Sequence, residues 1–290
     1  MTIADAVTGC RHERRRSHLR FGVTRRFVMC RPTHFDVVYA INPWMDVDLA
    51  VDTQRALEQW TSLRDQLSAL GHRVDVIDPP EALPDLVFAA NAGIVIGDIG
   101  LGARFRNPER QPESAIYERE FAALGVQLDE PSQVNEGEGD VLVHPASKVG
   151  NGMALAGYGP RSERDAHDEI AAHFGIELVS LRLVDDRFYH LDTACNILDD
   201  RTVAYYPGAF DEGSRRLLES TFDRAIVITD DDAAVLGANV ISDGTNVLMS
   251  DRTPVLSASL QDAGFRPLPL AMDEFTKSGG GPHCCVLECF

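Results

Sequence analysis

The strongest chemical signal in the chain is a cysteine that follows three glycines and a proline. Residues 277–285 read KSGGGPHCC, and a backbone so rich in glycine can turn tightly and approach a ligand closely. A structural cysteine lies more often inside an apolar run, whereas Cys284 stands at the mouth of a predicted strand. We therefore expect Cys284 to be a nucleophile. Cys285 would point to the opposite face of that strand, which fits a buried structural thiol.

The segment YHLDT, residues 189–193, pairs a histidine with a carboxylate. In a strand, His190 and Asp192 would lie on one face, about 7 Å apart. That arrangement suits a proton-transfer group beside a carboxylate that holds a cation. A lone histidine is usually structural, so this pair alone leaves both interpretations open.

A third polar cluster is EGEGD, residues 136–140. Two glycines among three acids are typical of an exposed turn or a loose calcium loop, but the regular ligand spacing of an EF-hand is missing. Glu138 and Asp140 share strand parity and precede an apolar run. We therefore expect these two carboxylates to point inward.

Amphipathic helices alternate with short β-rich segments along the chain. Apolar side chains at steps of three or four indicate helices over residues 57–70, 116–124, 166–174, 218–222 and 256–263. The β-rich runs that follow them are 72–77, 126–129, 176–181, 225–229 and 265–270. A strand, turn and strand follow each of the first four runs, so the chain repeats a ββαβ unit.

A polar or reactive residue stands near the head of each unit, and the five are Asn91, Asp140, Asp192, Asn239 and Cys284. Neighbours in this series are 45 to 52 residues apart, a near-constant period that marks repeat arrays. In a closed array these strand heads converge on one axis and form one site. The final segment, CCVLECF, would pair with the first strand, RFVMCRP, and close the ring. The alternative is a series of unrelated α/β units whose polar strand ends are solvated.

Composition and charge narrow the classes of function. The net charge of −18 over 290 residues disfavours nucleic acid and anionic membranes as partners, and no run of about 18 apolar residues could span a membrane. Residues 1–25 are rich in arginine but lack the apolar core of a signal peptide. We expect them to form a disordered basic tail, with an organelle-targeting role as the weaker alternative. The six cysteines lack the density of a disulfide framework, which favours a cytoplasmic protein.

With these three motifs in this order, the sequence resembles the guanidine-modifying superfamily with the pentein fold. That superfamily includes arginine deiminases, dimethylargininases, amidinotransferases and arginine dihydrolases. The resemblance spans residues 26–290 and rests on GGPHC, HLDT and GEGD. It implies an α/β fold, a pentein-type propeller of five ββαβ repeats around a pseudo-fivefold axis, in a single catalytic domain.

One departure from the superfamily pattern points to a branch. Its deiminases and dimethylargininases carry an acid where FAAN, residues 88–91, has Asn91. Together with Asn42 in the segment INPWM, this resembles the arginine dihydrolases, which turn arginine into ornithine, ammonia and carbon dioxide. A carboxylate leaves an unpaired charge against a neutral ureido group, whereas an amide can hydrogen-bond either substrate. The alternative for Asn91 is a turn residue before Gly93.

The resemblance also implies roles for individual residues. Cys284 would attack the guanidinium carbon as its thiolate, while Asp140 and Asp192 hold the planar cation. His190, oriented by Glu138, would protonate the leaving ammonia and then activate water. This route requires no metal and no organic cofactor.

Arg110 is our candidate for binding the α-carboxylate of the substrate, because a guanidinium grips a carboxylate bidentately. A surface arginine is the competing interpretation. The partner would then be a small molecule, arginine or a methylated arginine, and the protein could form a homo-oligomer. The alternatives are a dimethylargininase, a one-step deiminase and, from another class, an arginine-binding module without catalysis.

Overall fold

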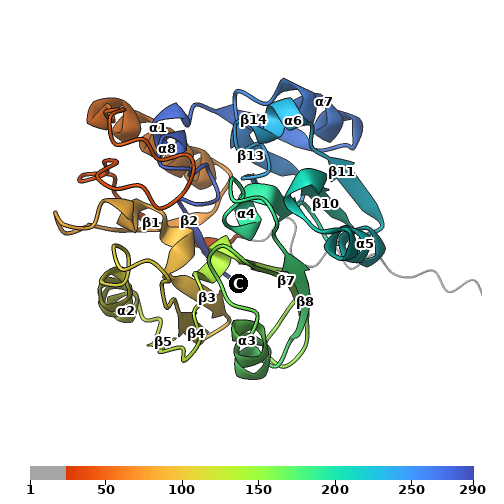
Figure 1. Cartoon of the computed structure of the whole chain (residues 1–290), viewed down its shortest axis with the longest axis horizontal. Coiled ribbons are helices and arrows are strands. Elements are labelled where there is room, and N and C mark those ends of the chain that lie inside the picture. Colours follow the sequence, from red (N-terminus) through yellow and green to blue (C-terminus); the bar gives the residue numbers. More distant parts are fainter. Residues whose placement is uncertain (1–23) are drawn as a thin grey trace, which may run out of the picture.

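The structure is a computed structural model that describes residues 24–290, so most of the expected basic tail lies outside the described residues. The fold is mixed α/β, which confirms the predicted class. Figure 1 shows the longer helices on the outside of the molecule, while the short helix α4 (Leu191–Ala194) lies near its centre. The C-terminal end of the chain also lies near the centre.

Three sheets share one pattern of strands and helices. Their strands are β6 (Val141–Val143), β7 (Met153–Tyr158), β8 (Glu177–Arg182); β9 (Cys195–Ile197), β10 (Thr202–Tyr205), β11 (Arg224–Val227); and β12 (Ile241–Ser242), β13 (Asn246–Ser250), β14 (Arg266–Leu270). In each sheet the first two strands are antiparallel and the last two are parallel. A helix connects the parallel pair, namely α3 (Ala166–Phe174), α5 (Glu212–Thr221) or α7 (Pro254–Asp262).

The fourth sheet joins the two ends of the described chain. Its order is β2 (Arg73–Ile77), β1 (Arg26–Cys30), β15 (Leu287–Cys289), β3 (Gly93–Ile96), β4 (Ile99–Gly102) and β5 (Leu128–Asp129). Helix α1 (Thr53–Ala69) connects β1 to β2, and α2 (Glu113–Ala123) connects β4 to β5. Strand β15 is antiparallel to β1, with Phe27 opposite Glu288, so the predicted pairing of the last segment with the first strand is confirmed.

The helices form where the apolar spacing predicts them. In α1 the side chains of Trp60, Leu63 and Leu67 are fully buried, and the Asp52 carboxylate caps the helix by accepting a hydrogen bond from the Arg55 amide at 3.0 Å. Helix α3 ends at Gly175 in the left-handed conformation, with φ of 65°, as its sequence predicts. One core cluster contains the buried face of α1 together with Cys284 and Cys285, so the loop that carries Cys284 packs against buried side chains.

Three of the five predicted strand heads stand in or beside short helical turns instead of strands: Asn91 in η2 (Ala89–Ala92), Asp140 at the end of η3 (Gly137–Gly139) and Asp192 in α4. The other short helical turns are η1 (Pro84–Val87), η4 (Pro207–Ala209), α6 (Asp230–Ala233) and α8 (Asp273–Thr276). Gly137 has φ of 61°, and a Cβ atom there would lie 2.7 Å from the Ala90 carbonyl oxygen. Close packing between η2 and η3 therefore sets these turns, and local sequence alone does not reveal it.

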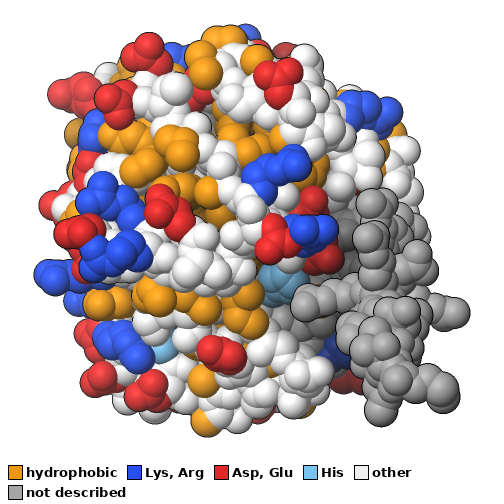
Figure 2. All heavy atoms as spheres, turned by 90° about the vertical axis from the view of Figure 1, so that its right-hand side faces the viewer, with side chains coloured by type: hydrophobic (Ala, Val, Ile, Leu, Met, Phe, Trp, Pro, Cys, Tyr) orange, Lys and Arg blue, Asp and Glu red, His pale blue; other side chains and the backbone are white. Residues whose placement is uncertain are grey.

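No helix within residues 24–290 is long and apolar enough to cross a bilayer. On the face in Figure 2, acidic and basic side chains are interspersed among apolar ones, so this face presents no continuous basic stripe.

Candidate active site

The thiol of Cys284 is buried in a turn that precedes β15, and two side chains hold it. Its Sγ donates to Asp192 Oδ2 at 3.2 Å and accepts from Asn239 Nδ2 at 3.1 Å. Asn239 Oδ1 also accepts the backbone amides of His283 and Cys284, at 2.9 and 3.2 Å. The neighbouring glycine is required, because a Cβ atom on Gly281 would lie 2.7 Å from Asn239 Oδ1. Three of the five predicted strand heads therefore meet at the sulfur.

Asp192 links the Cys284 thiol to the imidazole of His283. Its Oδ2 atom lies 3.0 Å from His283 Nδ1, while its Oδ1 atom is buried and has no hydrogen-bond partner in residues 24–290. Burial and the Asp192 charge raise the pKa of the Cys284 thiol well above its ordinary value. The resting thiol is therefore neutral at physiological pH, and Asp192 has one free oxygen for a cationic ligand.

His190 is held by Glu136. The Nε2 atom of His190 lies 2.7 Å from Glu136 Oε2, and the same oxygen accepts from Arg161 Nη1 at 2.8 Å. Burial opposes ionisation of Glu136, but Arg161 and His190 outweigh it and lower the pKa of this carboxyl. His190 thus rests on a stable carboxylate, as a general acid and base requires.

The prediction that Glu138 orients His190 is therefore wrong. Glu138 Oε2 accepts the Glu288 backbone amide at 2.9 Å, and its Oε1 has no partner within the described part of the chain. Burial raises the pKa of this carboxyl well above its ordinary value. The physical reason is the helical turn η3, in which Glu136 and Glu138 do not share the face that a strand would give them.

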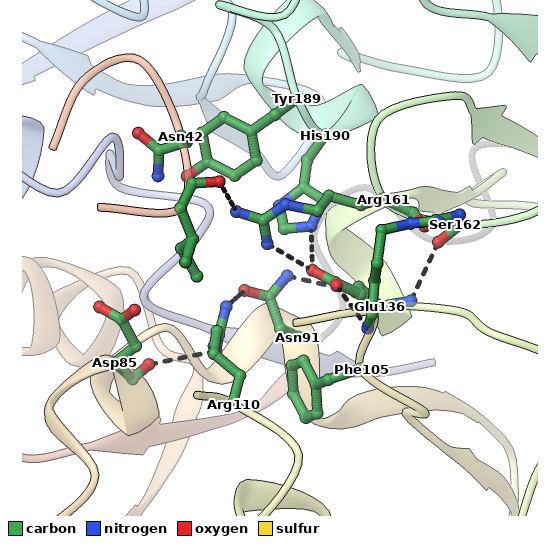
Figure 3. A network of polar contacts seen from close by, with 12 residues as sticks. Asn42, Asp85, Asn91, Phe105, Arg110, Glu136, Arg161, Ser162, Tyr189 and His190 are labelled. Atoms are coloured by element: carbon green, nitrogen blue, oxygen red, sulfur yellow. Dashed lines mark hydrogen bonds and ion pairs between the residues drawn. The ribbon is translucent and has the colours of Figure 1, made fainter. Parts of the chain in front are cut away.

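Asn91 and Arg110 form a buried chain of contacts that continues to Glu136 (Figure 3). Arg110 Nη1 donates to Asn91 Oδ1 at 2.7 Å, and Asn91 Nδ2 donates to the Glu136 carbonyl oxygen at 3.2 Å. Glu113 binds the other side of the Arg110 guanidinium bidentately, at 2.9 and 2.7 Å. Arg110 is 3% exposed, and Asn91, Glu113 and the Asp85 carbonyl accept from four of its five N–H donors, so most of its donors are not free for the predicted contact with a substrate carboxylate.

Asp140 is also engaged by protein atoms. Its Oδ1 accepts the Leu191 amide at 3.0 Å and its Oδ2 accepts the Ser162 amide at 3.1 Å. The Asp140 side chain is buried, as predicted, but both of its oxygens accept from backbone amides, which differs from the predicted role of holding the substrate cation. Asp140 ties the segment that carries His190 to the segment that carries Arg161.

A cavity of about 390 Å³ opens over this network. Asn42, Asn107, Arg161, Asp186 and Tyr189 supply its polar lining. The Tyr189 hydroxyl donates to the Gly279 carbonyl at 2.9 Å, and Arg161 lies over the Tyr189 ring at 4.7 Å. Through Tyr189 the cavity wall contacts the loop that carries Cys284, and through Arg161 it contacts the Glu136 carboxylate. Cys284, His190 and Asp192 are not among the residues that line the cavity. Within residues 24–290, no group of three or more His, Cys, Asp and Glu side chains is arranged to hold a metal ion.

Similarity to known proteins identifies the family of the chain. Residues 40–290 match the family described as eukaryotic N,N dimethylarginine dimethylhydrolase. The chain belongs to this family. An N(G),N(G)-dimethylarginine dimethylaminohydrolase of Mycobacterium tuberculosis is 47% identical to it over 91% of this chain and 86% of the relative.

The chain is also similar to proteins described as bifunctional. The bifunctional arginine dihydrolase/ornithine cyclodeaminase AgrE of Nostoc sp. is 40% identical over 91% of this chain, which spans only 37% of that relative. The crystal structure of the N-terminal domain of ArgZ bound to substrate, an arginine dihydrolase from the ornithine-ammonia cycle in cyanobacteria, matches with a TM-score of 0.86 at 36% identity, over 91% of this chain and 98% of that one. The activity of this chain is therefore the hydrolysis of a guanidino group.

Sequence reasoning missed two residues of the site, Glu136 and Arg161. Glu136 stands in the EGEGD motif at the same strand parity as Glu138 and Asp140, and that shared parity was the signal for it. Arg161 stands in the loop GPRSE, and nothing local distinguishes it from a surface arginine. Only the fold brings it 2.8 Å from Glu136.

Proposed function

We propose that the protein is an arginine dihydrolase. It converts L-arginine and two waters into ornithine, two ammonia and carbon dioxide, through a covalent amidino-thioether on Cys284. The observation that carries this choice is Asn91, an amide whose oxygen accepts from Arg110 and whose nitrogen faces the Glu136 backbone. A side-chain amide can hydrogen-bond both a guanidinium and a neutral ureido group, so citrulline is not rejected after the first hydrolysis.

Substrate enters through the cavity over the network. Arg161 lines this cavity and binds the α-carboxylate of the substrate, the role that the sequence suggested for Arg110. Glu136 and the Ile41 carbonyl accept from only two of its five N–H donors. A guanidinium with free donors is suited to an α-carboxylate. Asn42 lines the same cavity and contributes an amide there.

Asp192 binds the substrate guanidinium, and this contact promotes ionisation of the Cys284 thiol. Its free Oδ1 accepts a charge-assisted hydrogen bond from the substrate cation. That cation offsets the negative charge that helps to raise the pKa of the Cys284 thiol, so the thiolate forms when substrate is bound. Asp140 serves as a positioning residue for the His190 segment.

The first hydrolysis then proceeds in two steps. The Cys284 sulfur forms a bond to the guanidinium carbon, and His190 transfers a proton to the amino group, so that the C–N bond breaks and ammonia leaves. Water gives a proton to His190 and adds to the amidino carbon, and the C–S bond then breaks while the hydroxyl proton passes to the sulfur, which releases citrulline and the Cys284 thiol. Glu136 holds His190 in place for both transfers. A second hydrolysis of citrulline adds one water and releases ornithine, ammonia and carbon dioxide.

A dimethylargininase is the second candidate. The 47% identical relative carries that name, and so does the family as a whole. The two candidates share the nucleophile and differ in the leaving group, because dimethylarginine would lose dimethylamine and give citrulline.

The test compares kcat/KM for arginine and for asymmetric dimethylarginine with the purified protein. The dihydrolase proposal predicts that arginine is the better substrate and that ornithine is its product. Faster turnover of dimethylarginine, with release of dimethylamine, would replace the first candidate by the second.

We also propose that residues 26–290 form one catalytic domain in which five ββαβ units surround a pseudo-fivefold axis. Three sheets with the same strand order, and the occurrence of that order twice in the six-stranded sheet, support this arrangement.

A further inference from the structure

Asn239 lies directly against the nucleophile, yet none of the proposed steps uses it. Its side chain is fully buried. Its Nδ2 atom lies 3.1 Å from the Cys284 sulfur and 3.2 Å from the Asp192 carbonyl oxygen. Its Oδ1 atom lies 2.9 Å from the His283 backbone nitrogen and 3.2 Å from that of Cys284. The amide is therefore held at four points around the sulfur.

The contacts of the amide oxygen decide which end of Asn239 faces the sulfur. The two backbone nitrogens can only donate hydrogen bonds, so the side-chain atom that contacts both must be the oxygen. A flipped amide would place its NH2 group against two N–H groups and its oxygen against the Asp192 carbonyl. The group that faces the Cys284 sulfur is therefore the NH2 donor.

The sulfur thus has two side-chain neighbours with opposite electrostatic effects. The Asp192 carboxylate accepts from the thiol at 3.2 Å and favours its neutral form, whereas a hydrogen-bond donor favours the anion. Burial and the Asp192 charge raise the pKa of the Cys284 thiol, and a hydrogen bond from the Gly281 backbone opposes them. When a cation binds the free Oδ1 of Asp192, the Asn239 donor is already in place for the thiolate.

The backbone that presents Asn239 is strained. Leu236 has a left-handed φ of 59°, and it is the only non-glycine residue with a positive φ within residues 24–290. Its carbonyl oxygen accepts the Asn239 backbone amide at 3.0 Å, so the strained residue begins the turn that carries Asn239. A leucine stays in this conformation only where the surrounding structure enforces it, and such strain gathers at functional groups.

From this geometry we propose that Asn239 is a catalytic residue that stabilises the Cys284 thiolate by donating a hydrogen bond from Nδ2 to the sulfur. The inference deepens the proposed function, because it rests on Cys284 as the nucleophile, and it holds equally for a dihydrolase and a dimethylargininase. The hydrogen bond strengthens as the sulfur gains negative charge, since charge-assisted bonds are the stronger ones. Asn239 does not line the substrate cavity, so its effect falls on the chemistry and not on binding.

Two variants separate the donor from the contact with the loop. Asn239→Asp keeps an oxygen for the His283 and Cys284 amides but replaces the donor by a negative charge, whereas Asn239→Ala removes both contacts. If the donor stabilises the thiolate, Asn239→Asp is the more damaged variant. If the side chain only positions the loop, Asn239→Asp is the less damaged one.

The measurement is the rate constant for alkylation of Cys284 by iodoacetamide without substrate, with circular dichroism to verify folding. We expect a loss of about ten- to hundredfold in Asn239→Asp, the range of a hydrogen bond to a charged group, and a smaller loss in Asn239→Ala. Asn196→Asp is the matched control and should stay within about twofold of the wild type. Asn196 is also buried, but its Nδ2 atom has no hydrogen-bond partner within the described residues.

The outcome does not depend on which guanidine the enzyme hydrolyses, because no substrate is present. A rate in Asn239→Asp within about twofold of the wild type, or a smaller loss than in Asn239→Ala, would overturn the proposal. An unchanged rate in Asn239→Ala would do so alone, whether or not Asn239→Asp folds. In a Cys284→Ser background, Asn239→Ala should leave the Kd of the substrate within about threefold, and a tenfold weakening would assign Asn239 to binding instead.

Discussion

The His190 Nε2 atom lies 2.7 Å from Glu136 Oε2, and the same carboxylate oxygen receives Arg161 Nη1 at 2.8 Å. Glu136 therefore joins His190, the proposed proton-transfer group, to Arg161, one of the residues that line the cavity. A change at this one carboxylate should affect both the chemistry and the binding of the headgroup.

Replacing Glu136 with Gln should lower kcat about 10²- to 10⁴-fold, the range of a general acid and base. The neutral amide no longer stabilises a charged His190 and leaves Arg161 with a weaker partner. Glu138→Gln is the control, because Glu138 does not contact His190. Steady-state kinetics of both variants, with circular dichroism to verify folding, checks the assignment. A larger loss in Glu138→Gln than in Glu136→Gln would restore the interpretation drawn from strand parity.

Alkylation of the free enzyme should report the raised pKa of the Cys284 thiol. Burial and Asp192 hold this pKa above its ordinary value, so the thiolate fraction stays small at neutral pH and increases as the pH rises. The rate of inactivation by iodoacetamide should therefore keep increasing beyond pH 9. Peptide mapping assigns the label to Cys284, and Cys285→Ser should behave like the wild type. A rate that levels off below pH 8 would show that the resting thiol is already ionised.

Asn91→Asp should shift the products from ornithine toward citrulline. A carboxylate at this position would still accept from Arg110, but it would lose the donor to the Glu136 carbonyl and face neutral citrulline with a charge. An unsatisfied buried group costs about 1–3 kcal/mol, or roughly a five- to hundredfold handicap on the second step. The ornithine-to-citrulline ratio at low conversion is the measurement. If ornithine still dominates at the wild-type ratio, Asn91 does not control the second hydrolysis.

Acid should destabilise the fold through His167. Burial lowers the pKa of this imidazole to about 4, and its ring nitrogens contact Ser180 Oγ at 2.8 Å and the Gly157 carbonyl at 3.1 Å. Because the folded pKa is below the unfolded one, His167 contributes stability above pH 6.5 that is lost as the pH falls toward 4. The loss between pH 7 and pH 4.5 is about 2–3 kcal/mol. Urea unfolding of the wild type and of His167→Gln at both pH values measures how much of this loss in stability comes from His167. An equal pH dependence of stability in the two proteins would exclude His167 as the source of the loss.

The long helices could be predicted because the spacing of apolar residues along a helix is visible in the local sequence. Trp60, Leu63 and Leu67 recur at helical steps and are all buried in α1. The pairing of β15 with β1 followed from the repeat and is present, with Val28 opposite Leu287. Cys284, Asp192 and Asn239 also meet, as the near-constant period predicted.

The finer geometry of the site could not be predicted because tertiary contacts set it. The turn that places Glu136 against His190 depends on Gly137, whose left-handed backbone packs against Ala90. The burial of Arg110 follows from its pairing with Glu113 three residues later, and a solvated pair at the start of a helix has the same sequence pattern. Neither feature is visible in spacing or composition.

The stoichiometry of ammonia release tests the central claim most directly. Purified protein is incubated with L-arginine until the substrate is consumed, and ammonium, ornithine and citrulline are quantified, with Cys284→Ser as the control. The proposed function predicts two ammonium ions and one ornithine for each arginine, and no product from the variant. One ammonium ion with one citrulline for each arginine, or undiminished turnover by Cys284→Ser, would contradict it.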